Sequence, residues 1–137
     1  MSGFKRRARV LFLAGRYPVL AAQALLAGRE LAGEWLECRA ASMINAPVPA
    51  GLPQPENWSP DLLQQVDLLV AVDDDVPQWV LPAGVQRRNY SFVVAGLDAR
   101  PDDLAAALRQ SDAKARQRVM GMVGGMRLLQ NAAAEDT

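Results

Sequence analysis

The sequence contains no histidine and only one cysteine, Cys38, among its 137 residues. Without histidine there is no Ser-His-Asp triad and no histidine-ligated zinc site. A single cysteine forms neither an intramolecular disulfide nor a CxxC redox pair. These absences exclude much hydrolytic, metal-dependent and redox chemistry, and we expect neither a metal nor a cofactor.

Net charge and long apolar runs are also missing. Fifteen basic residues balance fifteen acidic ones, so no global charge attracts the chain to nucleic acid or to a membrane surface. No run approaches the ~20 apolar residues of a transmembrane helix. The apolar segment after the basic N-terminus is interrupted at Arg16, too early for a secretion signal, whose apolar core needs roughly 7–15 residues. We expect a cytoplasmic protein that binds neither nucleic acid nor membrane.

The composition is that of one globular domain. Half of the residues are apolar and 22% are charged, an ordinary balance for a folded chain. A chain of this length buries a core without disulfides or metals. We therefore expect a single domain over 1–137, with flexible ends at 1–7 and 131–137.

Apolar patterns alternate between strand and helix along the chain. Strands are predicted over 8–14, 34–41, 67–72 and 86–92. Helices are predicted over 19–31, from Ser59-Pro60 onward, over 76–81 and over 101–130. The near-continuous apolar strands are typical of a parallel sheet covered on both faces. The alternation predicts an α/β three-layer sandwich, with a four-stranded parallel sheet and helices on both faces.

Ligands of such sheets bind at the carboxyl ends of the strands. That rim is expected to carry residues 14–18, 42–44, 73–75 and 91–97. A long loop over 45–60, with five of the nine prolines, adjoins it. Its length exceeds the usual ~4–6 residues, which favours a functional or mobile segment.

Several strings, in this order, resemble the low-molecular-weight tyrosine phosphatase and arsenate reductase superfamily. The segment ARVLFLAGRYPVLAAQALLAG is similar to the family's first strand, loop and helix. Residues 67–75 (DLLVAVDDD) resemble its third strand with an acidic end, and residues 89–92 its aromatic approach to a general acid. The resemblance spans nearly the whole chain and implies the low-molecular-weight phosphatase fold.

The departures from that family lie where its chemistry is carried. The family's nucleophilic cysteine, which ends the first strand, falls at Ala14, and alanine cannot attack phosphorus or arsenic. The following loop, which in the family cradles an oxyanion, is shorter here, and Arg16 is not at the family's arginine position. Val93 and Val94 stand where a general acid is implied, and neither donates a proton. We interpret the chain as a non-catalytic relative, a pseudoenzyme acting through protein–protein contact, either with another protein or as a homodimer.

Three weaker sites accompany this interpretation. Gly15, Arg16 and Tyr17 precede a helix N-terminus, which favours anions, so the loop is either a weak anion site or a plain turn. Asp73, Asp74 and Asp75 form an acidic rim that either binds Mg²⁺ or caps the next segment. Cys38 lies in the middle of a predicted strand, where a buried thiol is inert.

Other functions remain open. One is an enzyme with altered chemistry on a phosphorylated small molecule, using Arg16 and the acidic rim. Another is an active phosphatase or arsenate reductase relative with a displaced nucleophile. The topology is also similar to phosphotransfer components of sugar-uptake systems, which likewise need the cysteine missing at Ala14. Glycines 121, 124 and 125 in the last helix allow close packing, which we expect within the chain rather than against a second subunit.

Overall fold

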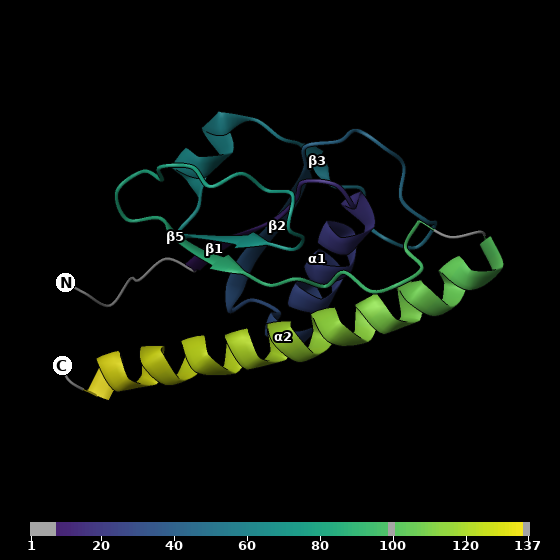
Figure 1. Ribbon diagram of the computed structural model, residues 1–137. Helices are drawn as coiled ribbons and strands as arrows, with labels where there is room; N and C mark the ends of the chain where they lie inside the picture. The colour runs from purple at the N-terminus through teal and green to yellow at the C-terminus, as the bar shows by residue number, and fades with distance from the viewer. Residues whose placement is uncertain (1–7, 99–100, 136–137) are drawn as a thin grey trace.

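The fold is a parallel five-stranded sheet with helices on both faces (Figure 1). The computed structural model describes residues 8–98 and 101–135, with side chains over 8–98 and 103–126. The strands are β1 (Ala8–Ala14), β2 (Leu36–Ser42), β3 (Glu56–Asn57), β4 (Leu68–Ala71) and β5 (Gln86–Asn89). Their order across the sheet is β3-β2-β1-β4-β5. The predicted α/β architecture is confirmed.

The fifth strand, β3, is the one that the sequence analysis missed. It consists of two residues within the proline-rich 45–60 loop, and it pairs with the end of β2. Prolines on both sides hide so short a strand, because they disfavour sheet interiors and are typical of loops and edges. An ion pair also links the loop to the neighbouring strand, since Arg39 on β2 contacts Glu56 at 2.6 Å.

The centre of the sheet is β1, which pairs with β2 on one side and with β4 on the other. Residues 10–14 of β1 have no exposed surface. A strand buried on both faces reads as a continuous apolar run rather than an alternating one. This is why VLFLA in β1 was recognisable as a core strand from sequence.

Helices α1 (Pro18–Ala32) and α2 (Pro101–Glu135) lie side by side on one face of the sheet. Helix α1 begins at Pro18 and ends at Gly33, whose φ of 55° suits glycine and whose N–H donates to the Arg29 carbonyl. Helix α2 continues five residues beyond its predicted end at 130, and in Figure 1 its C-terminal half extends past β5. Of the ends predicted to be flexible, 1–7 and 131–137, residues 131–135 belong to α2, and residues 1–7 and 136–137 lie outside the described residues.

The opposite face is covered by the short 3₁₀ helix η1 (Pro60–Gln65) and by the segment that follows β4. Ser59 caps η1, accepting from the Asp61 N–H at 3.4 Å, as its sequence predicts. Leu62 and Leu63 of η1 pack on the leucines of β1 that face away from α1. Over 8–98 and 101–135, no helix is long and apolar enough to cross a membrane.

The predicted helix over 76–81 was wrong, because this segment is irregular. The Arg87 side chain donates hydrogen bonds to the carbonyls of Val76 and Pro77, groups that a helix would have paired internally. Trp79 stacks on Trp58, with ring centroids 4.8 Å apart and planes 4° from parallel. Tertiary contacts of Arg87 and Trp79 thus hold the segment in a non-helical conformation.

Candidate functional site at the loop after β1

Three successive backbone amides in the loop between β1 and α1 converge on one carboxylate. Gly15 N–H donates to Asp73 Oδ1 at 3.0 Å, and Arg16 and Tyr17 N–H donate to Oδ2 at 2.9 and 3.0 Å. The Asp75 N–H adds a fourth bond, to Oδ1, at 3.1 Å. Consecutive amides that converge in this way form an anion-binding nest. The anion that this nest holds is the protein's own Asp73 side chain.

The pairing of strands in the sheet places Asp73 next to the loop. Strand β4 pairs with β1, and the Val72 N–H donates to the Leu13 carbonyl at 3.0 Å, so the next residue emerges beside the start of the loop. Asp73 is only 4% exposed, and a buried carboxylate requires hydrogen-bond donors. The four N–H groups supply them. Of the predicted acidic rim, only Asp74 and Asp75 are exposed, while Asp73 faces inward.

Gly15 allows the two segments to approach each other. A Cβ at Gly15 would lie 2.3 Å from the Asp75 carbonyl oxygen, closer than any side chain tolerates. Glycine is therefore required by this backbone contact, which brings the 15–17 amides within reach of the Asp73 carboxylate.

A second, exposed layer covers the nest. Tyr17 Oη donates to Asp98 Oδ2 at 2.8 Å, and Arg16 Nη2 lies 3.2 Å from the same oxygen. The hydrogen bond to Asp98, together with partial burial, raises the pKa of Tyr17 above its ordinary value. The side chains of Arg16 and Asp98 are 55% and 64% exposed, so their ion pair is screened by water and contributes little to stability.

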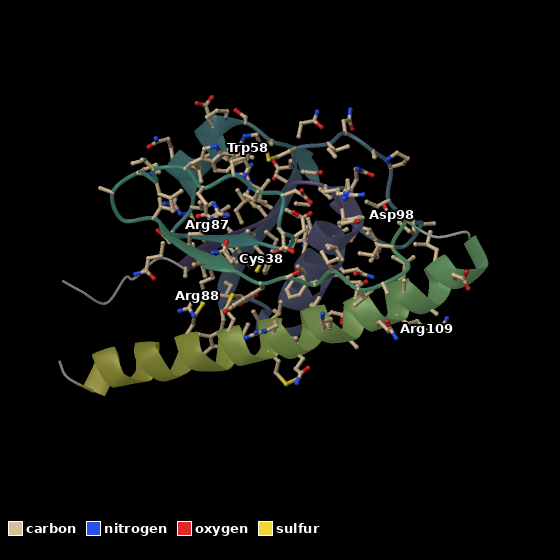
Figure 2. All side chains as sticks on the ribbon, in the orientation of Figure 1. Cys38, Trp58, Arg87, Arg88, Asp98 and Arg109 are labelled. Carbon is tan, nitrogen blue, oxygen red and sulfur yellow. The ribbon has the colours of Figure 1, made fainter. Side chains whose placement is uncertain are left out.

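Asp98 is the residue at this site that the sequence analysis missed. It lies in the turn after β5, on the loop that leads to α2 (Figure 2). Val93 and Val94, predicted to occupy the position of a general acid, are half-buried, and Val93 packs against the core. The sequence feature that could have indicated Asp98 is that it is an aspartate a few residues further along the same loop. Only the structure shows that this loop returns to Arg16 and Tyr17.

No described group at the end of β1 is a nucleophile. Ala14 has no exposed surface, and its methyl group belongs to the core beneath α1. Cys38 is on β2, opposite Val10, while Ser42 is opposite Ala14. At ~3.3 Å per residue, Cys38 therefore lies about 13 Å along the sheet from the loop. Burial raises the pKa of its thiol to about 11, which keeps it protonated and unreactive at neutral pH.

The remaining rim carries exposed apolar side chains. Met43 and Ile44, which follow β2, are 38% and 45% exposed. The Trp58–Trp79 stack lies near them, since the Trp58 N–H donates to the Ser42 carbonyl. Tyr90 does not belong to this surface, because it faces α2, where Arg118 lies 5.2 Å from its ring.

No metal site accompanies these features. Among the residues that the structure describes, no three His, Cys, Asp or Glu side chains are grouped so as to hold a metal ion. Both oxygens of Asp73 already accept hydrogen bonds from backbone N–H groups. A carboxylate surrounded by N–H donors is poorly placed to bind a cation.

The chain has the fold of arsenate reductases and low-molecular-weight tyrosine phosphatases. It matches an arsenate reductase from Archaeoglobus fulgidus with 23% identity and a TM-score of 0.63, over 84% of this chain and 98% of the other. It matches the low-molecular-weight tyrosine phosphatase of Bacillus subtilis with 11% identity and a TM-score of 0.57, over 87% and 97%. A tyrosine phosphatase from Escherichia coli K30, in complex with phosphate, matches with 7% identity and a TM-score of 0.53, over 82% and 96%.

No protein-family model matches the sequence, and no curated protein matches it. At these identities the likeness to solved structures shows the fold alone. The expected resemblance is confirmed at that level, and the chemistry of the site has to be argued from its own residues.

Proposed function

We propose that this protein is a non-catalytic member of the phosphatase and arsenate reductase fold, and that it acts by binding another protein. The observation that carries the proposal is the carboxylate of Asp73 in the nest of loop amides. A phosphatase loop has to offer those amides to an oxyanion of the substrate. Here they are paired with an internal anion whose negative charge also repels a second one.

The missing nucleophile supports the same conclusion. Ala14 offers no attacking group, and the half-buried Cys38 lies on another strand, with its thiol pKa raised to about 11. Asp98, an exposed carboxylate near the loop, accepts hydrogen bonds from Tyr17 and Arg16. The site therefore has a charged outer layer but no cysteine to form the covalent intermediate of that family's chemistry.

The rim supports protein binding as the remaining role. Met43, Ile44 and the Trp58–Trp79 stack place apolar and aromatic surface beside the closed loop. Aromatic and methionine side chains are enriched in protein interfaces. The proposed working surface is this rim together with the 45–60 loop, in a protein that we place in the cytoplasm.

Activity assays test the catalytic half of the proposal. The purified protein is incubated with an aryl phosphate, and separately with arsenate and a thiol reductant. We expect no turnover above the protein-free rate in either assay. Turnover that disappears in a Cys38→Ser variant would show a displaced nucleophile and overturn the proposal.

Capture in the native host tests the binding half. The wild-type protein, an Ile44→Glu variant and a Met120→Glu control are compared, because Met120 is exposed on α2 rather than on the rim. We expect a partner that the wild type and the control retain and that Ile44→Glu loses. Equal capture by all three proteins would rule out the rim as the binding surface.

A further inference from the structure

A groove of about 940 Å³ lies between β5 and α2, away from the loop after β1. Its floor is apolar, formed by Tyr90, the buried Met122 and the half-buried Met126. Its helical wall is low at Gly121 and Gly125, where an added Cβ would meet nothing within 4 Å. The glycines of α2 were expected to pack closely within the chain. They do not, and two of them open this groove.

Strand β5 presents an unpaired edge beside the groove. It is the last strand of the sheet, and within the described ranges it pairs only with β4. The amides of Gln86 and Tyr90 donate to carbonyls on the β4 side. Alternation along a strand therefore directs the intervening amides of Arg87 and Asn89 to the open edge. Such an edge is a ready template for an added strand.

The charge of the groove is positive. Arg88, exposed on β5, and Arg118, exposed on α2, both line it, and no acidic side chain among the described residues does. Figure 2 shows Arg88 in the space between β5 and α2. In the described part of the chain neither arginine forms an ion pair. These two guanidinium groups without an ion-pair partner, one of them over the Tyr90 ring, are complementary to a segment that alternates acidic and apolar side chains.

We propose that the β5–α2 groove binds an extended acidic segment of another protein. The segment adds as a strand to the edge of β5, and its carboxylates pair with Arg88 and Arg118. Its apolar side chains lie on Tyr90 and Met122. A second copy of this chain is a poorer occupant, because two β5 edges in register would bring their arginines together, and opposed like charges destabilise strand pairs.

This site is independent of the rim and goes beyond the proposed function. It shares no residue with the loop after β1 or with Met43 and Ile44. Failure here leaves the rim proposal intact, and failure of the rim proposal leaves this one intact.

The test uses the full chain and a fluorescein-labelled ten-residue peptide of alternating Glu and Val, with binding followed by anisotropy. We expect saturable binding that added salt weakens and that the Arg88→Glu, Arg118→Glu double variant weakens at least tenfold. The matched control is Arg109→Glu, an exposed basic residue on α2 outside the groove (Figure 2), which should change the affinity less than twofold. A Lys–Val peptide should not bind.

Amide hydrogen exchange tests the added strand itself. Exchange at Arg87 and Asn89 should slow at least tenfold when the Glu–Val peptide is bound, and a peptide N-methylated at alternate residues should lose most of its affinity. Binding without this protection would overturn the strand-addition model. So would absence of binding at millimolar peptide, equal loss in the Arg109→Glu control, or self-association of the free protein through this edge.

Discussion

The loop after β1 and the β5–α2 groove are two places where this fold offers donors to a ligand, and they are in opposite states. In the loop, three amides converge on an anion that the chain itself supplies, Asp73. In the groove, Arg88, Arg118 and the edge amides of β5 have no acidic partner among the described residues. A site is therefore closed when its polar groups already have partners within the fold, and available when they do not. Paired donors gain little from an external ligand, because binding it would first break the hydrogen bonds they already make.

Removing the internal anion is the largest perturbation of this contrast. In Asp73→Ala the loop amides lose their acceptor, and buried donors left unpaired cost roughly 1–3 kcal/mol each. We expect the free energy of unfolding, measured in urea, to fall by about 3–5 kcal/mol. Millimolar phosphate should restore part of it, about 2.7 kcal/mol at a hundredfold excess over the dissociation constant.

The matched control for that variant is Asp74→Ala. Asp74 is exposed and next to Asp73, so its loss should change stability by less than about 0.5 kcal/mol. A loss below about 1 kcal/mol for Asp73→Ala would mean that the loop does not depend on the carboxylate.

A pair of glycine substitutions compares the two regions directly. Gly15→Ala would place its methyl group 2.3 Å from the Asp75 carbonyl oxygen, and forced overpacking costs typically 1–3 kcal/mol. Gly121→Ala, in the helical wall of the groove, places its methyl group in open space and should stabilise the helix by about 1 kcal/mol. Urea denaturation should therefore give shifts of opposite sign. Shifts of the same sign would contradict the description of one region as closed and the other as open.

The half-buried thiol of Cys38 on β2, away from the loop, tests how well α1 covers the sheet. Its pKa, raised by burial from 9.0 to about 11, means that the folded state keeps a proton that the unfolded state releases. Stability should therefore be complete below pH 9 and should fall as the pH rises from 9 to 11. This decline should be missing in Cys38→Ala. Alkylation should be slow at pH 8 and fast in denaturant, and fast alkylation of the native protein would show an accessible thiolate.

The smallest effect is expected in the outer layer of the loop. Tyr17→Phe removes the hydrogen bond to Asp98, but Asp98 is exposed and Tyr17 keeps its ring packed against the core. Thermal unfolding should show a loss below about 0.5 kcal/mol. A loss several times larger would mean that Asp98, rather than Asp73, holds the loop in place.

The sequence predicted the parts of the fold that depend on local pattern. The apolar run of β1, the helix predicted over 19–31 and the short helix that begins after Ser59 each follow from residue types at fixed spacing, and the structure has all three. The two-residue β3 and the irregular 76–81 segment were missed, because pairing with β2 and the hydrogen bonds of Arg87 decide them. Those partners are distant in the chain.

The candidate site was predictable only in outline. The position of the loop and the lack of a nucleophile at Ala14 follow from the first strand and its resemblance to the family. The role of Asp73 does not, because its sequence offers three aspartates in a row, and only the pairing of β4 with β1 turns the first of them inward. Asp98 was missed for the same reason, since a turn after β5 returns it to the loop.

The central claim is that the amides of Gly15, Arg16 and Tyr17 are occupied by Asp73 and do not serve an external oxyanion. It is tested most directly by titrating the wild-type protein with phosphate while following these three amides by ¹H–¹⁵N NMR. The account predicts that their resonances stay unchanged at phosphate concentrations that saturate phosphate-binding enzymes. A saturable shift confined to these three amides would contradict it.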